Sequence, residues 1–400
     1  MKILLINECH YPRGGADIVY LNTGRLLESY GHEVHYFSIK SEKNISCPDE
    51  SYFFEKPKNA LAELFSFFYN RKAAKALDRM IRVIHPDVAH VHLLWGVLTP
   101  SVLKVLKLHH IPVVHTVHDY LMACPVNHFL DKEGNICERC KEAGYTECIR
   151  KRCYKGKLLK SIILTTEYKF RNRYFEPSKF FDGIVFVSEF SRRKHLEHKE
   201  RLSNITNIVL YNCTKDQGRP TSVNNGYYLY FGRLSDEKGV EVLIKAFLHT
   251  PQLHLKIVGD GPLRKSLEEL AANAENIEFL GYKRNPELSD LIRGSKYVII
   301  PSRCYENNPM TIVEAYSLGR PVIGSRIGGI PEIIDEHRTG YTFEMGNEDD
   351  LKDVVIRSGE LGESDYERMV NNAYEFYKAH FSEENYYSTL VSFYETFINE

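Results

Sequence analysis

Long hydrophobic segments are missing from this sequence. No apolar run reaches the roughly 18 residues that a helix needs to cross a bilayer. The first residues, MKILLINECHYPRGG, are typical of a buried strand followed by a glycine turn and not of a secretion signal. Short-period repeats and low-complexity tracts are also absent. We therefore expect a cytoplasmic protein without a transmembrane helix.

A large net charge is absent as well. The formal net charge at pH 7 is -1, with 43% hydrophobic and 26% charged residues, which argues against a disordered, collagen-like or fibrous chain. Residues 1–200 contain 31 Lys and Arg against 23 Asp and Glu, and residues 201–400 contain 21 against 30, so the halves carry +8 and -9. At 400 residues the chain is too long for one hydrophobic core, which predicts two domains.

Short apolar runs alternate with longer helical patterns along the chain, which is typical of parallel sheets joined by crossover helices. Strands are predicted at residues 2–7, 33–39, 88–92, 112–118, 183–188, 208–211, 227–232, 253–258, 277–280, 297–301, 321–324 and 341–343. Helices are predicted at about 16–30, 60–84 and 97–108, and the last fifty residues should form two or three closing helices.

The pattern predicts an α/β protein with two doubly wound, Rossmann-like domains that face each other across a cleft. A polar, turn-rich segment marks the linker between them. The expected boundaries are 1–214 for the first domain with a cysteine-rich insert at 124–155, 215–226 for the linker, 227–383 for the second domain, and 384–400 for a closing helix that packs back on the first domain. Open parallel sheets bind ligands at the carboxyl ends of their strands, so we expect the site in the cleft.

The segment from Ser302 to Glu332 carries the most informative motif. It follows a predicted strand, holds Glu306 in a loop, begins a helix near Pro309 and places Glu314 within that helix. Proline suits a first helical turn, and the free N–H groups of that turn favour an anionic or hydroxyl-rich ligand. Two carboxylates beside such a helix end can accept hydrogen bonds from sugar hydroxyls.

This motif closely resembles the acidic motif of the family 4 retaining glycosyltransferases, which have the GT-B fold. The resemblance rests on Glu306 and Glu314 with seven residues between them, followed by Ala315, Gly319, Pro321, Val322, Gly328 and Gly329. It implies that Glu306 holds the donor sugar and that Glu314 binds the ribose. It also implies that backbone amides at the start of the helix contact the diphosphate and the sugar. These are the amides of Asn308, Met310 and Thr311, on either side of Pro309.

A second motif ends the first strand of the second domain with a glycine and two cations, Arg233 and Lys238. Two positive groups there can neutralise a diphosphate and the charge that develops on it as it leaves. The resemblance makes Arg233 and Lys238 the pair that grips the nucleotide diphosphate. It also implies that the chain after Gly281 lines the nucleobase, which points to Tyr282 and Lys283.

In the first half, Gly14 and Gly15 lie between a strand and a helix, where a ligand can approach the backbone closely. A third glycine in register is missing, so the loop lacks the dinucleotide fingerprint and a hydride-transfer cofactor is not expected. The resemblance places this glycine pair beneath the donor diphosphate and the acceptor.

His118 ends the strand predicted at residues 112–118, and Asp119 follows it. The resemblance implies that His118 holds a sugar hydroxyl and the charge that develops near it. His90 and His92 end the preceding strand. They either line the acceptor side of the site or pack in the core of the domain.

Nine cysteines stand in a chain without an export signal, which favours thiols or metal ligands over disulfides. Cys137, Cys140, Cys148 and Cys153 are spaced closely enough for one tetrahedral thiolate site, where zinc would supply folding energy to a small polar insert. Disulfides and free thiols remain open. Similar cysteine-bearing inserts occur in some members of the family that the chain resembles, which does not settle the metal.

Residues 150–173 contain nine Lys and Arg and one Glu. An apolar face is predicted from Leu158, Leu159, Ile162, Ile163 and Tyr168. Such a helix either lies on an anionic membrane surface, where lipid-linked acceptors would be found, or packs on its domain with a solvated basic face. Nucleic-acid binding is not expected, because the aromatic residues form no stacking platform and the whole chain is neutral.

These features predict a retaining glycosyltransferase that moves a sugar from a UDP- or GDP-linked donor to a saccharide or lipid-linked acceptor, in surface polysaccharide assembly. The resemblance implies that catalysis requires no cofactor, and an Asp-x-Asp metal motif is absent. Peripheral contact with the inner face of the plasma membrane is part of this expectation. The alternatives are a sugar-nucleotide 2-epimerase of the same fold and a non-catalytic subunit that binds nucleotide sugars.

Overall fold

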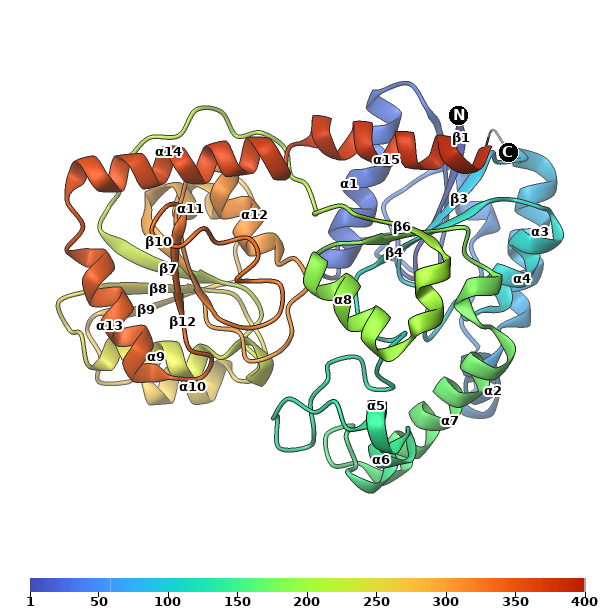
Figure 1. The fold of residues 1–400 in the computed structure, drawn as a ribbon, viewed down its shortest axis with the longest axis horizontal. Helices are drawn as coiled ribbons and strands as arrows, with labels where there is room; N and C mark the ends of the chain where they lie inside the picture. Colours follow the sequence, from blue (N-terminus) through green and yellow to red (C-terminus); the bar gives the residue numbers. More distant parts are fainter. Residues whose placement is uncertain (58, 399–400) are drawn as a thin grey trace. The chain divides into compact units, whose positions relative to one another are not determined.

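The computed structural model describes residues 1–57 and 59–398, and these form two compact units (Figure 1). Unit 1 comprises Met1–Leu210 and Tyr387–Glu400, and unit 2 comprises Tyr211–Tyr386. Each unit contains one parallel six-stranded sheet with helices packed on it. The α/β fold with two doubly wound domains is therefore confirmed.

The sheet of unit 1 has the strand order β2-β1-β3-β4-β5-β6, and all neighbouring strands are parallel. Its strands are β1 (Lys2–Ile6), β2 (Glu33–Phe37), β3 (Val88–Val91), β4 (Val113–Val117), β5 (Gly183–Phe186) and β6 (Thr206–Val209). The order reverses beside β1, because the chain passes to β2 on one side and to β3 on the other. Doubly wound sheets bind ligands at the carboxyl ends of the strands next to such a reversal.

The sheet of unit 2 has the order β12-β11-β10-β7-β8-β9, again all parallel. Its strands are β7 (Tyr227–Phe231), β8 (His254–Val258), β9 (Ile277–Gly281), β10 (Ser295–Ile300), β11 (Val322–Ser325) and β12 (Gly340–Phe343). Here the order reverses between β7 and β10. The loops that follow these two strands carry Arg233, Lys238 and Glu306.

Helices cover both sheets. Those of unit 1 are α1 (Gly15–Ser29), α2 (Ala60–Phe68), α3 (Arg71–Ile84), α4 (Ser101–Leu108), α5 (Cys140–Ala143), α6 (Thr146–Arg150), α7 (Leu158–Tyr174) and α8 (Glu189–His198). Those of unit 2 are α9 (Val240–Leu248), α10 (Arg264–Leu270), α11 (Glu287–Gly294), α12 (Met310–Ser317), α13 (Glu348–Gly359) and α14 (Glu363–His380), and α15 (Glu383–Ile398) follows. Among the described residues, no helix combines the length and the apolar character that crossing a membrane requires.

All twelve predicted strands are present, with β6 beginning two residues earlier than expected. The helix predicted at 60–84 is wrong in one respect, because it is two helices, α2 and α3. Asn70 separates them: its side-chain oxygen accepts hydrogen bonds from the amides of Lys72 and Ala73, which caps the start of α3. The helix predicted from residue 97 begins only at Ser101, directly after Pro100.

The division between the units differs from the predicted linker at 215–226. Unit 2 begins at Tyr211, so the predicted linker lies within it. The buried guanidinium of Arg320 donates hydrogen bonds to the carbonyls of Thr221 and Val223, which holds this segment against unit 2. Residues from Tyr387 onward belong to unit 1, so α15 begins in one unit and continues in the other.

Candidate active site

The best-formed cluster of predicted site residues lies at the strand reversal of unit 2. Lys238 Nζ is 2.5 Å from Glu306 Oε1, and the same carboxylate oxygen accepts a hydrogen bond of 2.7 Å from Ser302 Oγ. Burial alone would raise the pKa of Glu306, but the Lys238 ammonium and the Ser302 hydroxyl hold it below its usual value. Glu306 is therefore an anion and Lys238 a cation at neutral pH.

Backbone packing fixes the two loops that carry this pair. Gly239 follows Lys238 in the left-handed conformation, with φ of 67°, and a Cβ there would lie 2.0 Å from the carbonyl oxygen of Pro301. Gly328 has φ of 63°, and a Cβ there would lie 2.5 Å from Glu306 O. Glycine is required at both positions, because any side chain would push the loops apart.

Arg233 lies on the same β7 loop as Lys238, but its surroundings differ. Its side chain is exposed and forms no ion pair with any described residue. Its carbonyl accepts a hydrogen bond of 2.8 Å from the Tyr230 hydroxyl, which fixes the backbone at this point. The loop thus combines a cation already paired to a carboxylate with a second one that is available to an external anion.

Glu314 lies in the second turn of α12, and its carboxylate receives no hydrogen bond from any described residue. Burial raises the pKa of Glu314 to about 7. A half-buried carboxyl without a partner can accept hydrogen bonds from two neighbouring hydroxyl groups, such as those of a ribose. The structure therefore leaves Glu314 available for the role that the resemblance implies.

The start of α12 also has a structural role, which the sequence did not indicate. Met310 and Thr311 begin α12, so their amides lack intrahelical partners, whereas the Ile312 amide donates to the Pro309 carbonyl at 3.0 Å. The side chain of Asn308, in contrast, accepts a hydrogen bond of 2.8 Å from the Asn212 amide, and Asn212 Nδ2 donates to the Asn308 carbonyl. Asn308 thus ties the first residues of unit 2 to the Glu306 loop.

Tyr282 and Lys283 follow β9 at the same edge of the sheet, because all its strands are parallel. The Tyr282 ring is 65% exposed, and the Arg284 guanidinium lies 5.6 Å from its centre. Lys283 forms an ion pair of 3.3 Å with Glu287 in the first turn of α11. An exposed ring here can stack on a planar group, whereas Lys283 already has a partner.

The glycine loop of unit 1 is open to a ligand. Gly14 and Gly15 begin α1, and the nearest heavy atom to a Cβ at Gly14 would be an Asp17 carboxylate oxygen at 3.9 Å. Asp17 is buried, accepts a hydrogen bond of 2.9 Å from Asn7 Nδ2 and lies 3.5 Å from Arg13 Nε. These contacts of Asn7 and Asp17 therefore hold the loop in place. The motif analysis missed both residues.

His118 belongs to a network of neutral side chains. His118 Nε2 is hydrogen-bonded to His92 Nδ1 at 2.8 Å, and the rings of His90 and His92 lie 4.2 Å apart. His90 in turn is hydrogen-bonded to Thr116 Oγ1 at 2.6 Å and to the Tyr394 hydroxyl at 2.5 Å. Desolvation lowers the pKa of His118 to about 3, and the pKa values of His90 and His92 fall well below the usual range.

The predicted metal ligands do not form a ready site. Among residues 1–57 and 59–398, no three His, Cys, Asp or Glu side chains are arranged so that they could hold a metal ion. Cys137, Cys140, Cys148 and Cys153 are free thiols, and Cys148 and Cys153 are hydrogen-bonded to each other. Cys140 also interacts electrostatically with Cys124, Cys137 and Cys148.

The structure brings Lys238 and Glu306 into contact and places Arg233, Tyr282, Glu314 and the start of α12 on the same unit. Gly14, Gly15 and His118 lie in unit 1. Ser302 is a partner of Glu306 that the motif analysis overlooked. Its position directly after a buried strand, four residues before Glu306, was the available signal.

Comparison with known proteins identifies the class. The family model "Glycosyl transferases group 1" matches residues 214–376, and "Glycosyltransferase Family 4" matches residues 13–209. The Anabaena HepE protein, solved in complex with UDP-glucose, has a TM-score of 0.67 and 18% identity, covering 98% of this chain and 100% of that one. The two units therefore have the GT-B glycosyltransferase fold. The chain belongs to glycosyltransferase family 4.

Two curated relatives extend the comparison. An uncharacterized glycosyltransferase of Methanocaldococcus jannaschii is 31% identical over 177 residues, which cover 44% of this chain and 49% of that protein. The N-acetyl-alpha-D-glucosaminyl L-malate synthase of Bacillus anthracis is 23% identical over 408 residues, which cover 99% and 96%. The first match thus spans about half of the relative.

Proposed function

We propose that this protein is a retaining glycosyltransferase that moves a sugar from a nucleotide diphosphate sugar to a saccharide or lipid-linked acceptor. The contact between Lys238 and Glu306, beside the unpaired Arg233, carries the proposal. An ionised carboxylate can hold sugar hydroxyls, and the cations can bind the diphosphate. The similarity to a protein solved with UDP-glucose supports a uridine nucleotide as the first donor to test.

In the proposed reaction, the anomeric carbon loses its bond to the diphosphate and gains a bond to the acceptor oxygen. The diphosphate leaves with the bonding electron pair, and one of its oxygens takes the proton of the acceptor hydroxyl. Arg233 and Lys238 stabilise the negative charge on the departing diphosphate, and this is their main contribution to the rate of transfer. Retention requires the acceptor to approach from the face that the diphosphate leaves.

His118 contributes as a neutral ring in this scheme. With a pKa lowered to about 3, it carries no charge at physiological pH and can hydrogen-bond a sugar hydroxyl as a neutral ring. Glu314 accepts hydrogen bonds from the ribose, and Tyr282 stacks on the base. The glycine loop of unit 1 lets the acceptor side approach the backbone.

Calorimetric titration with UDP and GDP tests the nucleotide site. We expect one of the two to bind, and Arg233→Ala to weaken its binding by about tenfold or more, because a charge-assisted contact to phosphate is lost. Lys265→Gln, an exposed change in α10, serves as the matched control. The proposal fails if neither nucleotide binds.

A screen of nucleotide sugars then tests the reaction. Slow hydrolysis of one donor identifies its base and sugar, and the anomeric configuration of a transferred product, read by NMR, tests retention. A donor epimerised without any acceptor would instead indicate the 2-epimerase. An acceptor from surface polysaccharide assembly is part of the proposal and is tested last, with lipid-linked and free saccharides in parallel.

Zinc in the cysteine insert is a separate proposal. It is supported by four thiols in one insert, two of them hydrogen-bonded to each other, in a lobe with few buried apolar residues. Elemental analysis of protein purified without chelator should find about one zinc per chain. Protein that contains no zinc and shows a Cys148–Cys153 disulfide by mass spectrometry would contradict it.

A further inference from the structure

Helix α2 exposes apolar residues that a helix in a globular protein normally buries. Its sequence is ALAELFSFF, and none of its nine residues is buried. Leu61 is 72% exposed and Phe65 is 75% exposed, with Leu64 also on the surface. Isolated apolar side chains are common on protein surfaces, but a whole helix of them marks an interaction site.

Helix α7 adds a second exposed apolar group in the same region of unit 1. Tyr168 and Arg171 anchor it: the Tyr168 hydroxyl donates a hydrogen bond of 2.7 Å to the Met122 carbonyl, and both side chains are buried. Tyr168 thus lies on the side of α7 that packs on its own domain, which is one of the two expected arrangements. The first turns of α7 do expose apolar residues, namely Leu158, Leu159 and Ile162.

The two helices lie side by side (Figure 1), and their later turns touch through Phe68 and Phe170, whose ring centres are 5.7 Å apart. The exposed apolar residues named above precede this contact in the sequence of each helix. We call Leu61, Leu64, Phe65, Leu158, Leu159 and Ile162 the apolar patch. It is formed by segments almost 100 residues apart in sequence, so the amphipathic pattern of α7 alone could not reveal it.

Unpaired cations surround the apolar patch. Residues 150–164 contain six Lys and Arg and no Asp or Glu. Lys155, Lys157 and Lys160 are exposed and form no ion pair with any described residue. The acidic residue on α2 is Glu63, so the charge around the patch is strongly positive.

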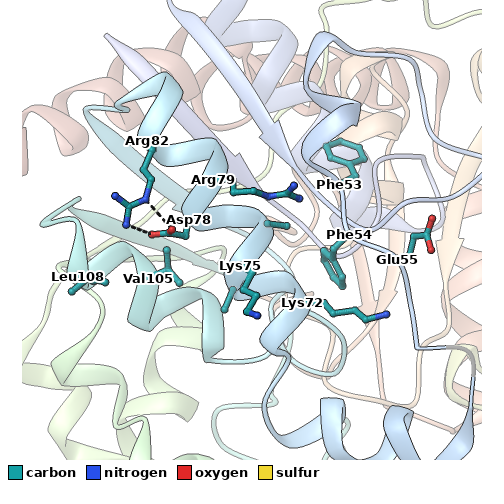
Figure 2. Close-up of a pocket in the computed structure, with 12 residues that line it drawn as sticks. Phe53, Phe54, Glu55, Lys72, Lys75, Asp78, Arg79, Arg82, Val105 and Leu108 are labelled. Carbon is teal, nitrogen blue, oxygen red and sulfur yellow. Dashed lines mark hydrogen bonds and ion pairs between the residues drawn. The ribbon is translucent and has the colours of Figure 1, made fainter.

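Helix α3, which follows α2 after two intervening residues, carries further cations. Figure 2 shows Lys72 and Lys75 projecting from α3 beside Phe54, with Arg79 one turn further on. These three cations form no ion pair with any residue that the structure describes, and they line a hollow of about 900 Å³. Asp78, the acidic residue of this hollow's helix, is already paired with Arg82 at 2.9 Å.

We propose that the apolar patch and its cations dock unit 1 on an anionic lipid bilayer. Apolar side chains of this kind enter the boundary between headgroups and acyl chains, while lysines on long stems reach the phosphates. The positive charge complements anionic lipid, and short helices with flexible lysines suit a fluid surface better than a shaped protein pocket. The inference deepens the proposed function, since a lipid-linked acceptor would lie at this surface.

Vesicle co-sedimentation tests the inference without any nucleotide sugar. We expect the protein to bind phosphatidylcholine vesicles that contain about 30% phosphatidylglycerol, and to bind pure phosphatidylcholine at least about tenfold more weakly. Binding should weaken steeply as salt is raised, because exposed charges are screened. Equal binding to both vesicle types, or binding to neither, would overturn the inference.

Two variants separate the parts of the surface. Replacing Lys155, Lys157 and Lys160 with Gln should weaken binding about 100-fold, at about fivefold per cation. Phe65→Ser with Leu159→Ser should weaken it by about tenfold per residue, because the inserted apolar area is lost. Val223→Ser, an equally exposed apolar site in unit 2, is the control.

Nucleotide titration on the same preparations reports whether each variant is folded. Vesicle binding that survives both sets of substitutions overturns the inference and leaves the proposed function untouched. The inference is also overturned if the protein binds no vesicles and forms a dimer in analytical ultracentrifugation, and if the Phe65→Ser, Leu159→Ser variant dissociates that dimer. Failure to bind nucleotide, with vesicle binding intact, would instead count against the proposed function.

Discussion

The two units prepare their candidate site residues in opposite ways. In unit 2, Glu306 and Lys238 are held ionised by each other, and Arg233 remains an unpaired cation. In unit 1, burial holds His118 and the histidines behind it neutral. Charge is thus concentrated in the loops for which we propose diphosphate binding, while the buried histidines of unit 1 offer hydrogen bonds without charge. The cations proposed to bind phosphate therefore lie in the half of the chain that is acidic overall.

The largest expected effect comes from Lys238→Ala. It removes the cation beside Glu306 and leaves a carboxylate that is mostly buried without its counter-charge, which should cost about 2–3 kcal/mol of stability. The rate of transfer, as kcat/KM, should fall about 1,000-fold, because charge on the leaving diphosphate is no longer stabilised. Initial-rate kinetics and urea unfolding measure the two effects.

The double variant Lys238→Met with Glu306→Gln provides the control for the stability effect. It removes both charges, so it should be more stable than Lys238→Ala although it is inactive. A Lys238→Ala protein that keeps its activity within about tenfold of the wild type would show that the pair is structural and not catalytic.

The next effect is a difference between the two units in how their stability changes as the pH falls. The pKa values of His115 and His118 are lowered by burial to about 4 and about 3, and those of His90 and His92 lie well below the usual range. Below about pH 6.5 the unfolded chain binds protons that folded unit 1 excludes, so its stability falls as pH falls. Each histidine contributes about 1.4 kcal/mol per pH unit between its two pKa values.

Hydrogen exchange measures this difference within one molecule. After correction for intrinsic rates, amides of β3 and β4 should lose protection between pH 7 and pH 5, while those of β10 and β11 should keep theirs. Equal loss in both sheets would show that the buried histidines do not set the acid sensitivity of unit 1.

A smaller effect should appear in unit 2 through Glu314, whose pKa is raised to about 7. Hydroxyl groups donate to the ionised carboxylate, so nucleotide affinity should rise about tenfold from pH 6 to pH 8. Stability should move the other way: folding disfavours the charged form, and the loss develops as pH rises from about 4.5 through 7. Glu314→Gln should abolish both dependences, and Glu363→Gln, an exposed change in α14, should abolish neither.

Titration of the nucleotide and its 2′-deoxy analogue at each pH checks the assignment. The deoxy analogue should bind wild-type protein with a weaker dependence on pH. If the nucleotide and its deoxy analogue show the same dependence of affinity on pH, Glu314 does not bind the ribose.

Much of the fold was predictable because its strands are short apolar runs bounded by glycine and polar turns, and all twelve were found. The break between α2 and α3 was not, because Asn70 acts through a cap that periodicity does not register. The contact that joins the predicted linker to unit 2 was not predictable for a similar reason: this polar segment is held by the buried Arg320, which is more than 90 residues away in sequence.

The same limit applies to the site. The motif spacing pointed to Glu306 and Lys238, since both lie at strand ends that a parallel sheet brings to one edge. It gave no sign of the Asn212–Asn308 contact or of the apolar patch, because each depends on which distant segments pack together. The sequence likewise left open whether the apolar face of α7 is exposed or packed, and Tyr168 is buried, with its hydroxyl donating to the Met122 carbonyl.

The smallest effect expected is that of Tyr394→Phe, which tests whether the neutral histidine network positions His118. The hydroxyl that bonds His90 at 2.5 Å is lost, leaving a buried nitrogen without that partner at a cost of about 1–3 kcal/mol. With the His90 ring less constrained, His92 and then His118 lose their fixed orientation, so kcat should fall about threefold with KM nearly unchanged. Tyr387→Phe is the matched control on α15, since it removes a bond of 2.8 Å to His32, outside the network. If the two variants lower kcat equally, the network only stabilises unit 1.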